Sequence, residues 1–449
     1  MRIAVTGFVS SESGSVASAN ALLLKQLIFA GVEIHFFSKP SFVDPRPIVG
    51  QWPNFRYIPV TNSISNCIRE SVEGIKVVGF AAGRLDAGCY NRLLVHAMRG
   101  ENHRHRYDAI LWMGDYARGR VPGVPTISFV QGAPGTDARS VLRRRAEIRR
   151  LAGARKAFQW EVLARLRLSR IGLPQFGNSD HFIVGSSVSR NCLARTYGVP
   201  SDRISITPYP IDLTLFKPRQ PKASVSCGME RSDGSPIRIL WLGRIIPRKR
   251  LDLFLDGAAK AIEQGLNLHM TIVGKVGFVA GYEKLIEGWP HRDRLNWIKG
   301  IQRTEVPRFM QTCDVLVQPS EEENFGSSVA EAQACGLPVI VGQTNGNADY
   351  LCASDTHLGD FLPATLADAL SKLARRKATM GLADGSESRA FAERCFNVSG
   401  VAENVMAILQ SVHAENRPRN GLLDSPVLGE SRIKTSKQSL GSFGGTGEK

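Results

Sequence analysis

The chain has 449 residues, of which 43% are apolar, and carries 57 Lys and Arg against 41 Asp and Glu, a formal net charge of +16. This length exceeds a single hydrophobic core and predicts two domains. No uninterrupted apolar run approaches the roughly 20 residues of a membrane span, so no transmembrane helix is expected. The positive charge predicts a polyanionic partner, and phosphates, nucleic acid and anionic lipid all fit it.

The N-terminus predicts a first strand rather than a secretory signal, because its short apolar run, residues 2–6, leads directly into a Gly/Ser loop. Eight cysteines are scattered without a Cys-x-x-Cys pair, which is typical of reduced, mostly buried thiols. Both features favour a cytoplasmic protein.

Three N-terminal segments predict a β-loop-α-β unit: strand 2–6, helix 17–29 and strand 32–37. The loop holds Gly14 but lacks the G-x-G-x-x-G fingerprint of dinucleotide-binding proteins, which disfavours a dehydrogenase. Residues 107–114 and 124–131 predict two further strands, the second of which ends at Gln131.

Residues 139–170 hold eleven Lys and Arg against two acidic residues, with apolar residues at helical intervals. We favour the interpretation that this basic segment is a solvated face covering the core of the N-terminal domain. The alternative is a peripheral contact with an anionic membrane, because basic amphipathic helices dock on anionic lipid headgroups. The segment lacks an aromatic platform or a recognised module for nucleic acid, so no nucleic-acid partner is expected.

Residues 219–235 are polar and rich in Gly and Ser, which is typical of a linker. A predicted strand over 237–242 then runs into Gly243 and Arg244, and Lys249 follows five residues after Arg244, where the next helix opens. Further segments alternate in type: helix 252–264, strand 269–275, helix 282–287, strand 295–300 and helix 306–311. Both domains should therefore have parallel sheets, with ligands at the carboxyl ends of the strands.

A predicted strand over 314–318 leads into a turn at Phe325–Gly326 and then into a helix. Such a junction points the free N–H groups and the positive dipole end of the helix above the strand's carboxyl end, which suits a phosphate. Glu323 and Glu331 stand on either side of the turn, where carboxylates can hold hydroxyls. A diphosphate between two groups that bind hydroxyls is what a sugar nucleotide needs.

The stretch 319–340 resembles the signature of the retaining glycosyltransferases of the GT-B architecture, the "glycosyl transferases group 1". The matching residues are Glu323, Phe325, Gly326, Glu331, Ala332, Ala334, Gly336, Pro338 and Val339. The chain departs from the family pattern at Asn324, where Gly is usual, and at Gln131, where a His acting on the donor sugar is usual. The resemblance implies an α/β fold of two Rossmann-like parallel-sheet domains that face a cleft.

The resemblance also implies roles for individual residues. Arg244 and Lys249 would stabilise the charge that grows on the departing diphosphate, the Arg as a bidentate fork and the Lys as a point charge. Glu331 would hold the ribose diol, and Glu323 with the Phe325–Gly326 backbone would hold the donor sugar. The other residues implied on the donor side are Gly14, Gly243 and Asn324.

Two patterns have competing structural explanations. Ser328 and Glu331 have the spacing of a helix capping box, so Glu331 could serve the helix rather than a ribose. His103 and His105 could form a metal pair, but flanking arginines favour a solvated loop. Because the Asp-x-Asp signature of the other major glycosyltransferase fold is also absent, no metal and no cofactor beyond the sugar nucleotide are expected.

The predicted organisation is an N-terminal acceptor-side domain over 1–218, a linker over 219–235, a nucleotide-sugar-binding domain over 236–397, a helix over 398–413 that crosses back to the first domain, and a disordered tail over 414–449. The resemblance implies a retaining hexosyltransferase of polysaccharide biosynthesis that acts on a glycan, lipid or small-molecule acceptor. Three alternatives remain: a catalytically silent sugar-nucleotide or nucleic-acid binding protein, a nucleotide-sugar epimerase, or a glycan phosphorylase.

Overall fold

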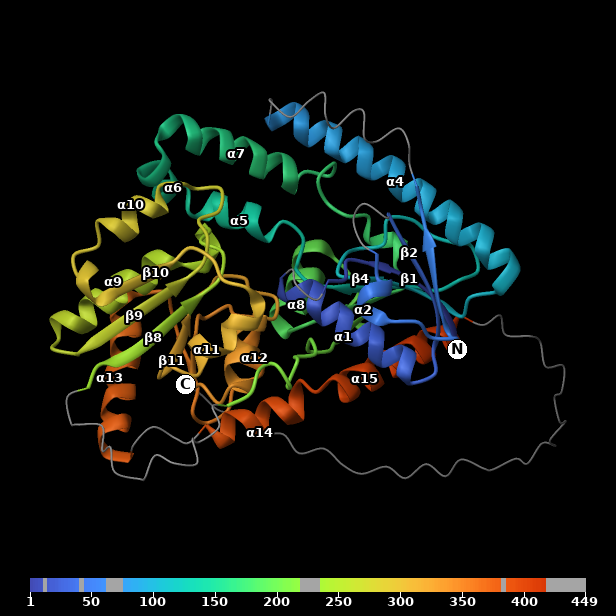
Figure 1. Cartoon of the computed structure of the whole chain (residues 1–449). Coiled ribbons are helices and arrows are strands. Elements are labelled where there is room, and N and C mark those ends of the chain that lie inside the picture. Colours follow the sequence, from blue (N-terminus) through green and yellow to red (C-terminus); the bar gives the residue numbers. More distant parts are fainter. Residues whose placement is uncertain (11–13, 40–43, 62–75, 219–234, 381–384, 417–449) are drawn as a thin grey trace, which may run out of the picture. The chain divides into compact units, whose positions relative to one another are not determined.

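Two parallel sheets organise the protein, which a computed structural model describes for residues 1–10, 14–39, 44–61, 76–218, 235–380 and 385–416 (Figure 1). Within these residues, the first sheet has seven strands in the order β3-β2-β1-β4-β5-β6-β7, and the second has six in the order β10-β9-β8-β11-β12-β13. The strand pairs of both sheets are parallel. The predicted α/β fold with two Rossmann-like sheets is confirmed.

The strands of the first sheet are β1 (Arg2–Gly7), β2 (Glu33–Ser38), β3 (Phe55–Pro59), β4 (Ala109–Met113), β5 (Thr126–Val130), β6 (His181–Val184) and β7 (Ile204–Ile206). Those of the second are β8 (Ile237–Leu242), β9 (Leu268–Val273), β10 (Leu295–Ile298), β11 (Val315–Gln318), β12 (Val339–Val341) and β13 (Thr356–His357). Central strands such as β4, β5 and β11 are buried at every residue. Helices cover both faces of a parallel sheet, which explains why these strands are mostly apolar and why Thr126, Ser128 and Gln318 are buried with them.

The helices before the second sheet are α1 (Ser15–Phe29), α2 (Arg46–Val49), α4 (Lys76–His105), α5 (Thr136–Arg143), α6 (Arg145–Ala152), α7 (Ala154–Leu168) and α8 (Ser187–Asn191). Those that follow are α9 (Leu251–Glu263), α10 (Tyr282–Glu287), α11 (Val306–Met310), α12 (Ser327–Ala334), α13 (Pro363–Met380), α14 (Ser386–Cys395) and α15 (Val398–Glu415). The predicted strand at 237–242 and the predicted helix at 282–287 have the observed bounds, and the other predicted elements agree with the observed ones to within a few residues.

The final helix returns to the first sheet. α15 contacts α1, and Nδ1 of His413 lies 2.8 Å from the carbonyl oxygen of Asp108, just before β4. One apolar cluster also joins buried residues of both sheets, such as Leu111 of β4 and Leu316 of β11. The proposed domain boundaries stay predictions, and nearly all of the linker 219–235 and of the tail after 416 lies outside the described residues.

The basic segment 139–170 packs on the second sheet. It forms α5, α6 and α7, whose buried residues Val141, Ile148 and Ala164 belong to the apolar cluster of β8 and β9. The ring centroids of Trp160 and Phe278 lie 4.6 Å apart. The prediction that this segment covers the N-terminal domain's core is therefore wrong, because helical periodicity shows which side is buried but not which sheet buries it.

Two smaller outcomes concern cysteines and membrane spans. The six cysteines within the described residues have free thiols, but only Cys335 among them is buried, so the prediction of mostly buried thiols is wrong. No helix in the described part of the chain is both long and apolar enough to cross a membrane.

Candidate active site

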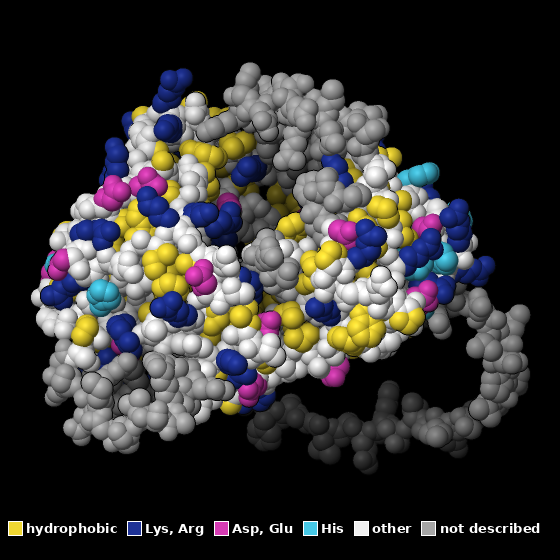
Figure 2. All heavy atoms as spheres, in the orientation of Figure 1, with side chains coloured by type: hydrophobic (Ala, Val, Ile, Leu, Met, Phe, Trp, Pro, Cys, Tyr) yellow, Lys and Arg dark blue, Asp and Glu magenta, His cyan; other side chains and the backbone are white. Residues whose placement is uncertain are grey.

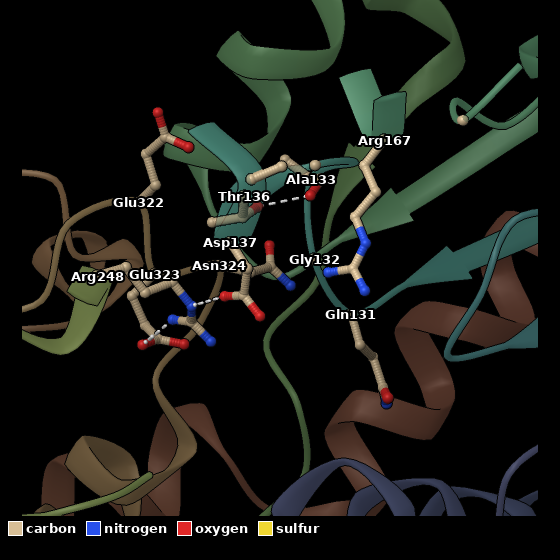
Figure 3. Close-up of a pocket in the computed structure, with 13 residues that line it drawn as sticks. Gln131, Gly132, Ala133, Thr136, Asp137, Arg167, Arg248, Glu322, Glu323 and Asn324 are labelled. Carbon is tan, nitrogen blue, oxygen red and sulfur yellow. Dashed lines mark hydrogen bonds and ion pairs between the residues drawn. The ribbon is translucent and has the colours of Figure 1, made fainter. Parts of the chain in front are cut away.

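A cavity of about 420 Å³ lies where the carboxyl ends of β5 and β11 face each other (Figure 3). Its lining includes Gln131, Asp137, Arg167, Arg248, Glu323 and Asn324. These residues come from the loop after β5, from α5 and α7, from the turn Pro247–Lys249 after β8, and from the loop after β11. A cavity at the carboxyl ends of parallel strands is the usual ligand position in such folds.

Glu323 binds two cations through one carboxylate oxygen. Nη1 of Arg248 donates to its Oε2 at 2.7 Å, and Nζ of Lys249 donates to the same oxygen. Burial alone would raise the pKa of Glu323, but the charges of Arg248 and Lys249 outweigh burial and lower this pKa to about 2. Glu323 is therefore a fixed anion at neutral pH.

Arg248 links Glu323 to α5, the helix that follows β5 of the first sheet. Its Nε donates to Oδ1 of Asp137 on α5 at 2.6 Å (Figure 3). Burial would lower the pKa of Arg248, but the two carboxylates outweigh burial and raise it. No hydrogen bond of its third nitrogen, Nη2, is found among the described residues, so a donor remains on the rim of the cavity.

Lys249 and Arg244 have different surroundings. Lys249 ends the 3₁₀ turn Pro247–Lys249, two residues before α9, and does not open that helix as predicted. Burial lowers its pKa, Glu323 opposes this effect, and the charge of Arg244 adds to the lowering. Arg244 is exposed directly after β8, and within the described residues its side chain has no ion pair. Gly243 before it has φ of 150°, which side chains rarely adopt.

The residues after Glu323 tie its loop to the first sheet. The side-chain amide of Asn324 hydrogen-bonds to the hydroxyls of Ser189 and Tyr209. Phe325 is 1% exposed, and its ring centroid lies 4.9 Å from that of Tyr209. Gly326 precedes α12 with φ of 66°, which favours glycine. The free N–H groups of α12 are thus held next to the acidic loop.

Glu331 lies inside α12 and pairs with Nη2 of Arg303 at 2.7 Å. Burial raises the pKa of Glu331, and the charge of Arg303 offsets this effect only in part. The alternative of a capping box does not hold, because α12 begins without a side-chain cap and the Ser328 hydroxyl pairs with the Gln318 amide instead. The carboxylate is therefore not used to hold the start of the helix.

Gly14 and Gln131, which lie in loops next to strands of the first sheet, differ in their relation to the cavity. Gly14 precedes α1 in an exposed position and is not among the residues that line the cavity. Gln131 does line it, and its Nε2 donates to Oδ1 of Asn20 at 2.6 Å. Gln131 therefore fixes the end of β5 to α1.

Comparison with known proteins gives a family match for the part of the chain that forms the second sheet. Residues 229–380 match the model of the family described as Glycosyl transferases group 1. This part of the chain belongs to the family. The match covers β8 to α13 and includes Arg248, Lys249, Glu323 and Glu331.

Two curated members have informative alignments. The D-inositol 3-phosphate glycosyltransferase of Paenarthrobacter aurescens is 31% identical over 189 residues, which are 40% of this chain and 45% of that protein. The GDP-mannose-dependent alpha-(1-6)-phosphatidylinositol monomannoside mannosyltransferase of Mycolicibacterium smegmatis is 25% identical over 260 residues, which are 54% of this chain and 66% of that protein. The chain thus spans about half to two thirds of the length of these two relatives.

A solved structure extends the similarity to both sheets. The crystal structure of Anabaena HepE in complex with UDP and glucose has a TM-score of 0.59 and 15% sequence identity, and the match covers 92% of this chain and 100% of that one. At this identity the similarity concerns the fold. The GT-B architecture is confirmed.

Arg248 is a central residue of this site that the sequence did not single out, and the same is true of Asp137 and Arg303. The resemblance gave roles to Arg244 and Lys249, and Arg248 was only a basic neighbour in the run 247–250. Its partner Asp137 lies 111 positions away in the chain. Next to it, Arg250 faces elsewhere and bonds to Asp252 and Glu321, so adjacency in the run does not identify the site cation.

The group 1 fold also brings together three side chains that could bind a metal. Ligand atoms of His35, Glu101 and His105 lie within 4.8 Å of one another. However, Nη1 of Arg56 lies 3.1 Å from Nε2 of His105 and 3.4 Å from the Glu101 carboxylate. A guanidinium already supplies positive charge there, so the group does not fit a cation. His103 and His105 lie in the last turn of α4, not in the predicted loop.

Proposed function

We propose that the protein transfers a hexose from a nucleoside diphosphate sugar to an acceptor hydroxyl with retention of configuration, as group 1 enzymes do. The supporting observation is the pair of cations, Arg248 and Lys249, that share Glu323 on the rim of the cavity. This arrangement lies beside Arg244 and the start of α12, within the part of the chain that matches the family.

The chemistry requires stabilisation of the departing diphosphate. Lys249 and Arg248 would release part of their interaction with Glu323 to the phosphates, and Arg244 would complete the set of cations. The N–H groups at the start of α12 add further donors. The positive field is already in place before the donor arrives, which is the condition for electrostatic catalysis.

The state of Glu323 limits its role. A carboxylate with a pKa of about 2 is a very weak base at neutral pH, so Glu323 would bind sugar hydroxyls rather than accept the acceptor's proton. We assign that proton to the leaving phosphate, as in a front-face mechanism. Glu331 would accept hydrogen bonds from the ribose diol, with Arg303 holding its other side.

The acceptor and the cell compartment are part of the same proposal. The two relatives are named for an inositol phosphate and a phosphatidylinositol mannoside, both polyols bearing phosphate. Together with the net charge of +16, this favours a glycan or lipid-linked polyol acceptor that carries an anionic group. We place the enzyme in the cytoplasm, with the segment 139–170 in peripheral contact with an anionic membrane and no nucleic-acid partner.

A panel of UDP-, GDP- and ADP-sugars in a thermal-shift assay tests donor binding. A ligand at about 100 times its dissociation constant stabilises the folded state by roughly 2.7 kcal/mol, so the correct donor should raise the melting temperature. Transfer of radiolabelled sugar, or hydrolysis of the donor, then tests catalysis. Binding without either reaction would indicate a silent sugar-nucleotide binding protein, and no shift with any sugar nucleotide would contradict the proposal.

A further inference from the structure

Helix α7 has apolar residues on two opposite sides. One side carries Trp160, Ala164 and Leu168, which pack against the cluster of the second sheet. The opposite side carries Phe158, Val162 and Leu166, spaced four residues apart and therefore on one face of the helix. A surface helix normally has polar residues opposite its packed side, so this outer face needs its own explanation.

The outer face is exposed. Phe158 is 67% exposed, Val162 36% and Leu166 38%, and Ile171, three residues beyond the helix, is 76% exposed. We call these four residues the α7 stripe. Exposed large apolar residues elsewhere in the described chain lie singly or in pairs along the sequence, whereas four of them fall within fourteen positions here. Clustered exposure of this kind marks a surface that binds a partner.

Cations surround the α7 stripe. Arg155, Lys156, Arg165 and Arg170 are exposed, and Glu161 is the one acidic residue of α7, paired with Arg165 at 2.7 Å. Figure 2 shows dark blue Lys and Arg side chains among yellow hydrophobic ones over the region where Figure 1 places α7. Apolar side chains bordered by Lys and Arg fit the boundary between anionic headgroups and acyl chains.

The stripe also adjoins the cavity. Arg167 and Gly172 line the cavity, and each directly follows a residue of the stripe, Leu166 and Ile171. Figure 3 shows the Arg167 side chain extending from the helix toward the space between Gln131 and Glu323. A surface lying on the stripe would therefore be next to the cavity wall that Arg167 and Gly172 form.

We infer that the α7 stripe is a membrane-docking face, which inserts Phe158, Val162, Leu166 and Ile171 into an anionic lipid surface and presents lipid-linked acceptors to the cavity. The presentation of acceptors rests on the proposed function, whereas the docking does not. The membrane contact proposed for the segment 139–170 is thereby assigned to one side of α7. α5 and α6 are excluded from the main contact because neither helix carries one of the exposed large apolar residues of the described chain. In addition, Arg139 and Arg143 of α5 pair with Glu322.

Co-sedimentation with vesicles tests the docking. The parent protein should bind phosphatidylcholine vesicles that contain phosphatidylglycerol, and added salt should weaken the binding. The triple variant Phe158→Ser, Val162→Ser, Leu166→Ser should lose at least about tenfold in partition coefficient, because it removes the apolar side chains that insert. The matched control Leu362→Ser removes a residue of similar exposure, 58%, next to α13, and should bind like the parent.

A second pair of variants tests the charge separately. Arg155→Gln with Arg170→Gln should weaken binding by about fivefold for each residue, whereas Lys372→Gln with Arg375→Gln on α13 should not. Equal sedimentation of the parent and the triple variant, or of anionic and neutral vesicles, would overturn the inference. So would light scattering that shows a dimer dissociated by the triple variant, since a second copy would then cover the stripe.

One further measurement separates docking from catalysis. Hydrolysis of the sugar-nucleotide donor, which needs no lipid, should be equal in the parent and the triple variant, while transfer to a vesicle-borne acceptor should fall with lipid binding. If the parent binds vesicles but never turns over a donor, the docking face stands and the proposed function fails. If the parent turns over the donor but does not bind vesicles, the proposed function stands and the docking face fails.

Discussion

Glu323 and Glu331 are the same residue type and lie eight positions apart on either side of one turn, and their side chains are only 12% and 4% exposed. Yet their environments shift their pKa values in opposite directions. Two cations bind Glu323 and lower its pKa to about 2. One cation binds Glu331, and burial prevails and raises its pKa. The number of opposing charges, and not burial, distinguishes the two carboxyls.

This difference suggests separate tasks. Glu323 holds its charge firmly and, through Arg248 and Lys249, fixes the positions of the cations that a diphosphate would meet. Arg303 pairs with one oxygen of Glu331, so the other oxygen could accept hydrogen bonds from hydroxyl groups. The first carboxylate would organise the charges of the site, and the second would select a ligand with a diol.

The largest effect is expected at the cations. Lys249→Ala and Arg244→Ala should each reduce turnover by on the order of a hundredfold, because a lost donor to the developing charge costs about that much. Turnover at saturating donor, with melting curves as a check of folding, is the measurement. Lys260→Ala, an exposed lysine of α9, is the control and should behave like the parent. Near-parental turnover in both variants would remove the diphosphate assignment.

A smaller effect is expected at Glu331. Glu331→Gln should weaken donor binding by about tenfold, because the amide is uncharged and has a single acceptor oxygen, for which Arg303 and the diol would compete. The melting temperature should be close to that of the parent, because Gln has nearly the size of Glu and its amide oxygen can still accept a hydrogen bond from Arg303. Calorimetric titration with the donor measures the affinity. Unchanged affinity in Glu331→Gln would contradict the ribose assignment.

The sequence predicted that Glu323 and Glu331 belong to the donor site, but not that their pKa values shift in opposite directions. The strand, turn and helix around Glu323 follow from local patterns, since an apolar run, a Phe-Gly turn and Ala-rich sequence each have a strong local preference. The partners are long-range: Arg248 and Lys249 come from 75 and 74 positions away, and Arg303 joins Glu331 from another loop. A pKa depends on such contacts, which no local pattern contains.

The helices also show what local sequence patterns cannot predict. α4 was not predicted, because Gly79, Gly83, Gly88 and Gly100 lower helix propensity along its length. The basic helices were predicted, but the sheet they pack on was not, because an amphipathic pattern does not name its partner. The α7 stripe illustrates this, since its Phe and Leu residues have the same spacing as buried ones and only their exposure sets them apart.

The smallest expected effect is also the most direct test of the contrast between the two carboxyls. Glu323 has a folded-state pKa below the ordinary glutamate value of 4.5, so its contribution to stability is present above about pH 4.5 and is lost as the pH falls toward 2. Glu331 has a raised pKa, so its contribution is present below pH 4.5 and is lost as the pH rises through the folded-state value.

The two amide variants should therefore deviate from the parent in opposite directions when melting temperatures are followed from neutral pH into acid. Glu323→Gln should lose less stability than the parent below about pH 4.5, because the parent must protonate a carboxylate held by two cations. As the pH falls from neutral to 4.5, the melting temperature of Glu331→Gln should rise less, or fall more, than that of the parent. The variant lacks the carboxyl group whose protonation stabilises the folded state. Parallel melting profiles for the two variants would mean that Arg248 and Lys249 do not set the charge of Glu323, and the division of tasks between the two carboxyls would fail with it.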